Sequence, residues 1–300
     1  MTSGKGPKRV AVLARRGKTF GGGRRELRAA LRQAGHDAPL WYELSRSGEA
    51  PDAIDEAMEE GADLVYAWGG DGLVQRCIDT LVDCALDVPL AILPAGTGNL
   101  LARHFEIPRE VGPAVEIGLR GRRMPIDVGR INGECFAVMA GCGADAITMG
   151  SVSKASKRRL GALAYVRSGM RAVHEEPRQI RVRVDGKDWF EGLASCVLVG
   201  NIGEIQGGLR LFPRARPDDG VLEVAVVTAR TQPEWLRVLA RVASGHPDRS
   251  PFVQTTRARE KVRVKHTAPA AYELDGGARD PVKKLRVDVA RRAVTLCVPK

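Results

Sequence analysis

The chain has 300 residues, a length that suits two domains of ordinary size. Hydrophobic residues make up 44% and charged residues 28%, a composition that excludes an intrinsically disordered protein. The net charge of +11 suits nucleic acid, anionic lipid or a phosphorylated ligand, but an aromatic content of 5% argues against a nucleic-acid module.

Targeting and metal signals are weak in this sequence. No segment approaches the roughly 20 apolar residues of a membrane span, and Met1 to Val10 lacks the apolar run of a signal peptide. We therefore expect a cytoplasmic protein. The 6 cysteines include no CxxC pair and the 5 histidines are scattered, so we expect reduced cysteines rather than a zinc site.

The first part of the chain alternates short apolar runs with amphipathic segments. Strands are expected at residues 10–13, 64–68 and 90–93, and helices at 24–32 and 51–60. This βαβα order predicts an α/β domain with a parallel sheet between layers of helices, over residues 1–123.

From about Met124 the pattern changes to short strands. Arg178 to Val184 alternates charged and apolar residues, and Asp185-Gly186 then supplies a pair typical of hairpin turns. Further strands are expected at 193–199, 221–227, 261–265, 285–289 and 294–298, with helices at 156–173 and 233–243. We therefore predict a second domain, an antiparallel β-sandwich over residues 124–300.

A glycine-rich loop follows the second of the expected N-terminal strands. Leu64 to Trp68 runs directly into Gly69-Gly70-Asp71-Gly72, and a helical pattern comes next. Glycines let the backbone approach a phosphate, and a helix N-terminus offers free N–H groups. Asp71 can meet a magnesium ion or orient a phosphate; the alternative is that it only caps the helix.

A second loop repeats the arrangement about 25 residues later. Leu90 to Pro94 is followed by Ala-Gly-Thr-Gly-Asn and another helical pattern. Thr97 can donate to a phosphate, and Asn99 can bond the facing loop. Two such loops at neighbouring strand ends form a crevice at the carboxyl edge of a parallel sheet, where ligands bind in open α/β folds.

The order of motifs resembles the diacylglycerol kinase catalytic-domain family, which includes bacterial lipid kinases and sphingosine kinases. GGDG followed by PAGTGN carries the resemblance in the first domain. Later matches are Asp127 to Gly133 with Phe136, then Asn201, the segment Leu211 to Leu222 with its DDG turn, and Glu273 to Gly276. The resemblance covers nearly the whole chain.

This resemblance implies an ATP-dependent lipid kinase with an α/β domain like those of phosphofructokinase and NAD kinase, and a β-sandwich second domain. It implies an ATP site between the two domains and a lipid alcohol as acceptor. The nucleotide contacts that it implies are Gly69, Gly70, Asp71, Gly72, Leu73, Gly96, Thr97 and Asn99.

A magnesium site near the DDG turn is also implied by the resemblance. Its ligands would be the Asp219 carboxylate and the backbone oxygens of Arg216 and Val221. Magnesium prefers hard oxygen ligands, which fits this set. The alternative for Asp218-Asp219-Gly220 is a plain turn between two strands.

Two departures from the family pattern bear on the acceptor and on catalysis. Leu73 and Leu100 resemble sphingosine-type members, so the acceptor is left open between diacylglycerol and a sphingoid-like lipid. The glutamate of the family's late DGE motif, a general base, is Gly277 here. Asp275 and Asp280 are the candidate substitutes, and Asp275 would lie on the same face about 7 Å away in an extended segment.

Loss of a general base has a limited effect on the reaction rate. General-base catalysis supplies roughly 10²–10⁴-fold in rate, whereas phosphoryl transfer relies mainly on positioning and charge neutralisation. A slow kinase and a pseudo-kinase that binds nucleotide or lipid both remain open. An NAD kinase also carries GGDG, but its following asparagine-glycine-leucine-glycine-phenylalanine run is absent.

The expected helix around 156–173 bears on membrane contact. Lys157, Arg158 and Arg159 lie beside apolar residues, as in helices that rest on an anionic membrane surface. The alternative is an ordinary domain helix with solvated lysines and arginines. We expect a peripheral protein with a lipid substrate and no nucleic-acid partner, and a homodimer is among the oligomeric states left open.

Overall fold

The computed structural model describes residues 7–18, 21–143, 177–204 and 210–300. The chain divides into two compact units. Unit 1 comprises Met1–Ile126 and Arg292–Lys300, and unit 2 comprises Asp127–Arg291. The helix expected at 156–173 lies outside the described residues.

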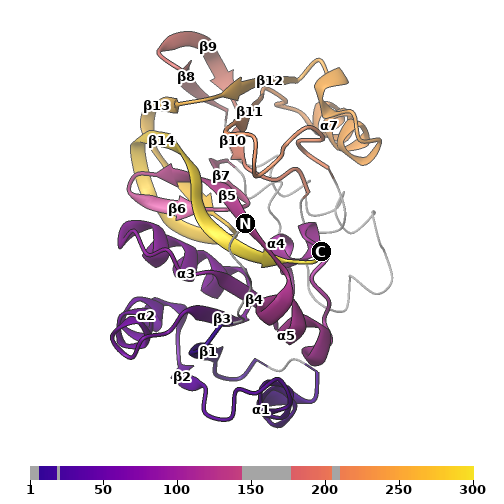
Figure 1. The fold of residues 1–300 in the computed structure, drawn as a ribbon. Helices are drawn as coiled ribbons and strands as arrows, with labels where there is room; N and C mark the ends of the chain where they lie inside the picture. The colour runs from indigo at the N-terminus through magenta and orange to yellow at the C-terminus, as the bar shows by residue number, and fades with distance from the viewer. Residues whose placement is uncertain (1–6, 19–20, 144–176, 205–209) are drawn as a thin grey trace. The chain divides into compact units, whose positions relative to one another are not determined.

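Unit 1 is built on a parallel sheet with the strand order β2-β1-β3-β4 (Figure 1). The strands are β1 (Val10–Arg15), β2 (Leu40–Leu44), β3 (Leu64–Gly69) and β4 (Leu90–Pro94). The end of β14 (Gly277–Val298) adds to this sheet, because Leu296 pairs with Leu90 in parallel orientation.

Helices cover both faces of the unit 1 sheet. They are α1 (Gly23–Gln33), α2 (Ala50–Glu59), α3 (Asp71–Asp83), α4 (Leu100–His104) and α5 (Val111–Arg120), with a short 3₁₀ turn η1 (Ser47–Glu49). Helix α1 contacts α5 and α2 contacts α3, and Figure 1 shows the two pairs on opposite sides of the strands. The predicted three-layer α/β domain is confirmed.

Burial on both faces explains the apolar strands of unit 1. Every residue of β3 is buried, as expected for a parallel strand between two helix layers. Tyr66 of β3 donates its hydroxyl to the Val115 carbonyl of α5 at 2.7 Å. A Cβ at Gly118 would lie 2.2 Å from the Tyr66 hydroxyl oxygen, so α5 packs here through a glycine.

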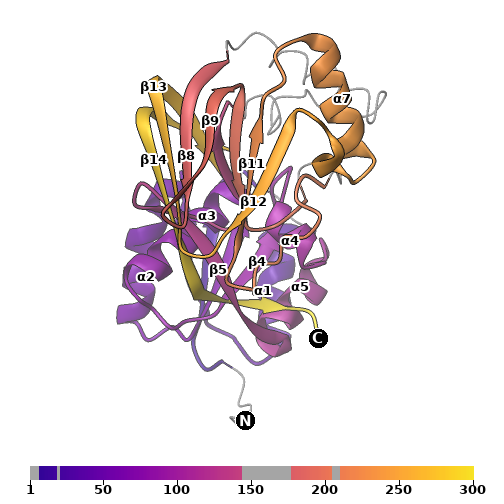
Figure 2. The ribbon, with the colours of Figure 1, turned by 90° about the horizontal axis from the view of Figure 1, so that it is seen from above.

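Unit 2 is an antiparallel sheet domain (Figure 2). Its main strand order is β12-β11-β10-β7-β13-β14, with β8 on β13, β9 on β8, and β5 beside β14 and β6. The strands are β5 (Arg122–Ile131), β6 (Glu134–Phe136), β7 (Met139–Cys142), β8 (Arg178–Val184), β9 (Lys187–Ala194), β10 (Cys196–Gly200), β11 (Leu222–Val227), β12 (Val253–Ala258) and β13 (Lys261–Leu274). Helix α7 (Gln232–Ala243) and the 3₁₀ turn η4 (Pro247–Arg249) lie beside β11 and β12 (Figure 2).

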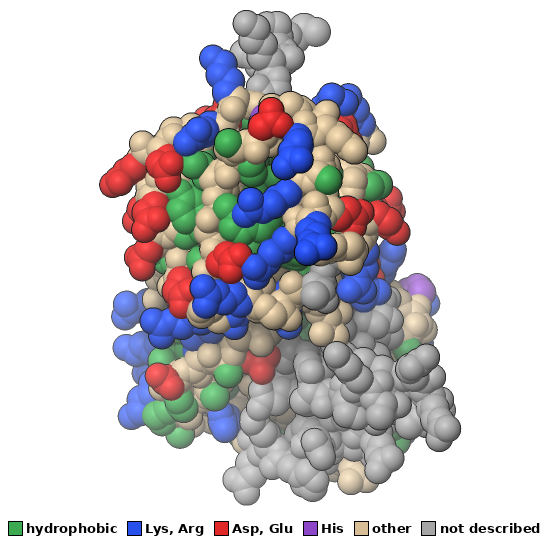
Figure 3. All heavy atoms as spheres, turned by 90° about the horizontal axis from the view of Figure 1, so that it is seen from below, with side chains coloured by type: hydrophobic (Ala, Val, Ile, Leu, Met, Phe, Trp, Pro, Cys, Tyr) green, Lys and Arg blue, Asp and Glu red, His purple; other side chains and the backbone are tan. Residues whose placement is uncertain are grey.

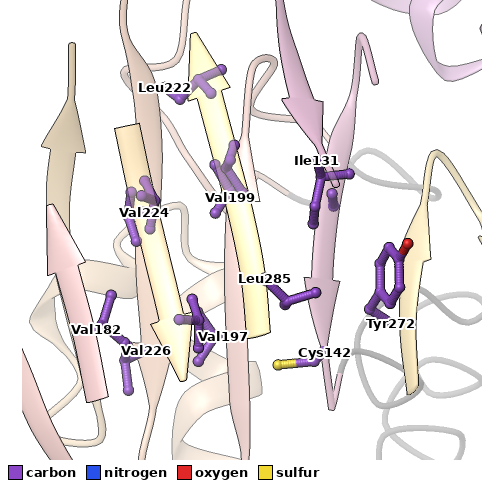
Figure 4. Close-up of a cluster of buried hydrophobic side chains, with 14 of the residues drawn as sticks. Ile131, Cys142, Val182, Val197, Val199, Leu222, Val224, Val226, Tyr272 and Leu285 are labelled. Atoms are coloured by element: carbon purple, nitrogen blue, oxygen red, sulfur yellow. The ribbon is translucent and has the colours of Figure 1, made fainter. Parts of the chain in front are cut away.

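The core of unit 2 is made of alternating residues from these strands. Figure 4 shows Val197 and Val199 of β10 lying close to Val224 and Val226 of β11. In β8 the pattern alternates strictly, with Ile180, Val182 and Val184 buried and the residues between them exposed. One buried face is what the sequence alternation predicted for β8, whereas β10 and β11 are buried at every residue. The antiparallel second domain is confirmed.

The chain boundaries of the two units differ in detail from the expected seam at 123/124. Unit 1 extends to Ile126 and takes in the last residues from Arg292 onward. The strands expected at 285–289 and 294–298 form one strand, β14, which runs from unit 2 into unit 1. Arg292, with φ 48°, marks an irregularity where this strand changes unit.

Among the described residues, none of the helices combines the length and apolar character needed to cross a membrane.

Candidate active site

The GGDG loop joins β3 to α3 in unit 1. Gly70 precedes the helix in an extended conformation, and its carbonyl accepts the N–H groups of Leu73 at 3.0 Å and Val74 at 3.2 Å. The Leu73 side chain is buried beneath the loop, where a Cβ at Gly69 would lie 2.7 Å from its Cδ2. The Leu73 side chain therefore packs against the loop, and only the backbone of Leu73 can contact a ligand.

The Asp71 carboxylate holds the GGDG loop to the second glycine loop. Its Oδ2 accepts the N–H of Asn99 at 2.8 Å and its Oδ1 accepts the N–H of Leu100 at 2.6 Å. Burial raises the pKa of Asp71, whereas these two N–H groups and Arg103 act to lower it. Asp71 is therefore a clamp between two loops as well as the first residue of α3.

Asn99 shapes the second loop from within. It lies in the left-handed region, with φ 50° and ψ 49°, which asparagine tolerates better than most residues. Its Oδ1 accepts the Gly96 N–H and its Nδ2 donates to the Gly96 carbonyl, both at 2.9 Å. The side chain is therefore used within its own loop, while its backbone N–H bonds the facing loop.

The two loops touch through backbone. A Cβ at Gly96 would lie 2.5 Å from Gly70 Cα, closer than real Cβ atoms come to such an atom. Thr97 and Gly72 are exposed beside this contact. The geometry leaves the N-terminus of α3 and the Thr97 hydroxyl accessible, an arrangement that can receive phosphate oxygens.

All eight residues predicted to contact nucleotide thus lie in two loops that the fold brings together. The sequence did not indicate that the backbone N–H of Leu100 would face Asp71. No local pattern signals such a bond, because its donor and acceptor are separated by a strand and a helix.

In unit 2, Asp275-Gly276 is the tight turn between β13 and β14 rather than part of an extended segment. Its φ angles, 46° and 82°, match those of Asp185-Gly186 between β8 and β9, at 48° and 83°. Both are hairpin turns with consecutive positive φ angles, for which an Asp-Gly pair is favoured. The extended geometry assumed for the candidate base is therefore corrected by the structure.

The Asp275 carboxylate is occupied by three backbone donors. It accepts the N–H groups of Ala137 at 2.8 Å and of Val138 and Met139 at 2.9 Å, and it is 8% exposed. The Asp275 N–H in turn donates to the Met139 carbonyl at 2.9 Å. To act as a general base, this carboxylate would have to give up bonds that hold β13 to β7.

Asp185 makes the same set of bonds at the other hairpin. It accepts the N–H groups of Arg259 at 2.8 Å and of Glu260 and Lys261 at 2.9 Å. Burial acts to raise the pKa of Asp185, but the three N–H groups outweigh it and the pKa lies below its ordinary value. The repetition indicates a structural role for the Asp-Gly pair at both turns.

The remaining residues of the candidate base region surround Gly277. A Cβ there would lie 2.9 Å from Nη1 of Arg279, at the far end of a long side chain. Arg279 is bonded to Glu134 through Nε at 2.9 Å and Nη2 at 2.8 Å. Asp280 lies on β14 with an exposed side chain.

The DDG turn is held by residues distant in the sequence. The Asp127 carboxylate accepts the Gly220 N–H at 2.6 Å, and the Asp127 N–H donates to the Pro217 carbonyl at 2.6 Å. Asn201 donates through Nδ2 to the Asp127 carbonyl at 2.8 Å. Three of the motifs noted in the sequence therefore meet in one hydrogen-bonded group within unit 2.

Comparison with known proteins identifies the family. The diacylglycerol kinase catalytic domain matches residues 17–131, and the YegS C-terminal NAD kinase beta sandwich-like domain matches residues 137–298. A Pseudomonas aeruginosa protein named "probable lipid kinase YegS-like" is 34% identical over 68% of each chain. The chain belongs to the diacylglycerol kinase family. A "diacylglycerol kinase" of Bacillus subtilis is 29% identical over 81% of this chain and 80% of its own.

Solved structures agree with this assignment at the level of fold. A diacylglycerol kinase from Bacillus anthracis superposes with a TM-score of 0.79 at 22% identity, over 99% of this chain and 98% of that one. An NAD kinase from Archaeoglobus fulgidus gives a TM-score of 0.53 at 13% identity, over 98% of this chain and 94% of that one. The predicted family and fold class are confirmed.

At the DDG turn, both oxygens of the single carboxylate in the implied magnesium site have protein partners. Asp219 Oδ1 accepts the Val221 N–H at 3.1 Å, and Oδ2 accepts Nη2 of Arg257 at 2.7 Å. The neighbouring Asp218 is paired with Arg216 at 3.3 Å. In the described part of the chain, no group of three His, Cys, Asp or Glu residues is placed to hold a metal ion.

Figure 3 shows lysine and arginine side chains gathered across the middle of one face, beside exposed hydrophobic side chains, with aspartate and glutamate side chains mostly toward its left and right edges. The basic residues predicted to contact a membrane, Lys157, Arg158 and Arg159, lie outside the described residues.

Proposed function

We propose that this member of the diacylglycerol kinase family is an ATP-dependent lipid kinase that transfers the γ-phosphate to a lipid hydroxyl. The observation that carries the proposal is the clamp between the glycine loops, in which Asp71 bonds the N–H groups of Asn99 and Leu100. The clamped glycine loops are in contact with each other. The N-terminus of α3 and the Thr97 hydroxyl lie beside this contact.

The phosphates of ATP would lie against the first-turn N–H groups of α3 and the Thr97 hydroxyl. Gly70 and Gly96 let the two loops meet, Gly69 accommodates the Leu73 side chain, and Gly72 leaves open space at the start of α3. Asn99 keeps the second loop in shape. Magnesium bound to ATP would neutralise phosphate charge during transfer. Asp71 positions the second loop. It lies in the part of unit 1 where the phosphate charge would be placed.

For the acceptor hydroxyl, Asp280 is the remaining candidate base, because Asp275 is bonded to three backbone donors and Gly277 has no side chain. The acceptor proposed is diacylglycerol or a sphingoid-like lipid, met at the surface of an anionic membrane by a cytoplasmic protein. Transfer without a well-placed base would be slower by roughly 10²–10⁴-fold.

A second candidate function is a pseudo-kinase that binds nucleotide or lipid without turnover. The observation that favours it is Gly277 together with the structural use of Asp275. The support for an NAD kinase is the shared GGDG loop and a similarity of fold at 13% identity.

The test is transfer of label from γ-labelled ATP, with magnesium, to a panel of lipid alcohols in mixed micelles and to NAD in a parallel assay. Asp71→Asn removes the charge and one of the two clamp bonds, because asparagine has a single acceptor oxygen. Asp52→Asn, on an exposed position of α2, is the matched control. Label in one lipid, lost in Asp71→Asn and kept in Asp52→Asn, supports the lipid kinase. Label in NAD alone refutes it.

Absence of label in every acceptor would favour the pseudo-kinase, provided that a fluorescent ATP analogue still binds the wild-type protein. Absence of both label and nucleotide binding would refute any role of the glycine loops in binding ATP.

A further inference from the structure

Arg257 bridges two carboxylates at the DDG turn. Its Nη2 lies 2.7 Å from Asp219 Oδ2 and its Nε lies 3.0 Å from Glu223 Oε1. Glu223 is 7% exposed, so its carboxylate is largely withdrawn from water. A buried carboxylate needs a nearby positive charge, which the guanidinium supplies here.

The sheet fixes the backbone position of Arg257, whose side chain is 46% exposed. Strands β11 and β12 pair antiparallel with Glu223 directly opposite Arg257. On the other side, Asp219 is fixed in its turn because the following residue, Gly220, donates its N–H to Asp127 at 2.6 Å. The guanidinium is therefore held between two carboxylates whose own places are determined by the fold.

This arrangement competes with a divalent cation for the same oxygens. Magnesium requires near-octahedral oxygen ligands at about 2.0–2.1 Å. Of the Asp219 oxygens, one is bonded to the Val221 N–H and the other to the guanidinium. A cation of charge +2 beside a guanidinium would also be repelled by it.

We propose that Arg257 supplies, at the DDG turn, the positive charge that a magnesium ion was expected to supply, so that unit 2 keeps this turn without a divalent cation. The proposal concerns unit 2 alone and does not depend on which acceptor the protein phosphorylates, or on whether it is a kinase or a pseudo-kinase.

A neighbouring recess makes the proposal testable by metal rescue. A cavity of about 330 Å³ lies beside the pair, lined by Glu223 and Arg257 together with Thr255, Thr256 and residues 211–214 and 245–248. A hydrated metal ion can reach the carboxylates through such a space once the guanidinium is removed. Truncation of Arg257 should therefore convert a metal-independent site into one that takes a metal.

The experiment uses the full chain without nucleotide and measures two quantities. The first is the melting temperature in EDTA and in millimolar Mg²⁺; the second is Mn²⁺ binding by electron paramagnetic resonance. Arg257→Ala is compared with Arg181→Ala, since Arg181 pairs with its cross-strand partner Glu191 at 2.8 Å on an exposed hairpin.

The wild-type protein is expected to melt at the same temperature in EDTA and in Mg²⁺. Arg257→Ala is expected to melt lower by roughly 2–8 °C in EDTA, to recover at least half of that loss in Mg²⁺, and to bind Mn²⁺ at least tenfold more tightly than wild type. Arg181→Ala should show no dependence on metal.

Two results would overturn the proposal. One is Mn²⁺ binding by the wild-type protein that Asp219→Asn abolishes, which would show a metal already held at the turn. The other is a folded Arg257→Ala protein that neither recovers in Mg²⁺ nor binds Mn²⁺. If Arg257→Ala does not fold, the wild-type and Asp219→Asn measurements decide alone, and absence of metal binding in wild type supports the proposal.

Discussion

Replacing Asp275 by asparagine tests whether this residue is structural, and Asp185 provides an internal comparison. Both residues begin a hairpin turn with φ near 47°, at 46° and 48°, and both accept three consecutive backbone N–H groups. Asparagine tolerates the same left-handed backbone, so the substitution removes the carboxylate without straining the turn. The two sites differ mainly in burial.

The expected loss of stability follows from the hydrogen bonds that Asp275 accepts. An asparagine has a single acceptor oxygen, so it can keep the Val138 and Met139 bonds of Asp275 but turns an amide donor towards the Ala137 N–H. One hydrogen bond to a charged acceptor is lost, and one backbone N–H is left buried without an acceptor. Together these changes should destabilise unit 2 by about 3 kcal/mol. At the more exposed Asp185, water replaces the lost partner and about 1 kcal/mol is expected.

The assay is thermal unfolding followed by circular dichroism, with the urea midpoint as a second measure. For a unit of this size, we expect a decrease in melting temperature of roughly 6–12 °C for Asp275→Asn and 2–4 °C for Asp185→Asn. Equal losses at the two sites would refute the dependence on burial. An unchanged melting temperature together with lost activity in Asp275→Asn would instead identify Asp275 as a catalytic base.

Three further outcomes are expected. Gly96→Ala should weaken binding of an ATP analogue at least tenfold, because its Cβ would lie 2.5 Å from Gly70 Cα, whereas Gly112→Ala, with nothing within 4 Å, should leave binding unchanged in a fluorescence titration. Gly277→Glu should raise turnover by roughly 10²-fold if a missing base limits the rate, while Gly277→Gln should not. Equal rates for these two variants in a labelled-ATP assay would show that a missing base does not limit turnover. Because the folded pKa of Asp185 is lowered, its stabilising effect is present above the unfolded pKa of about 3.9 and is lost as pH falls through the folded pKa. Acid unfolding of Asp185→Asn should therefore begin from a lower stability but show a shallower dependence on pH, and parallel acid curves for the two proteins would contradict this assignment.

The family and the architecture could be predicted from the sequence because their signals are local. Buried parallel strands appear as continuous apolar runs, and the two glycine loops follow such runs directly. The Asp185-Gly186 turn was likewise predictable, since an Asp-Gly pair between alternating segments favours that backbone geometry. Each of these features depends on residues close together in the chain.

Other features depended on pairings across the chain and could not be predicted in this way. Asp275 is bonded to residues more than 130 positions earlier, so its sequence context indicated a candidate base and the fold gave it a structural role. The path of β14 from unit 2 into unit 1 depends on its parallel pairing with Leu90. Neither the partners of Asp275 nor the strand that pairs with β14 can be predicted from the residues adjacent in the sequence.

The sequence by itself determined the fold class, the family and the positions of the two glycine loops, because periodicity and turn chemistry act over a few residues. Only the tertiary structure decided what the charged groups of those motifs do. Asp71 became a clamp because β3 and β4 are adjacent, and Asp219 became paired with Arg257 because the β11–β12 register places that arginine opposite Glu223. The strength and meaning of a charge depend on what lies within a few ångströms of it, and that is set by strand pairing between distant segments.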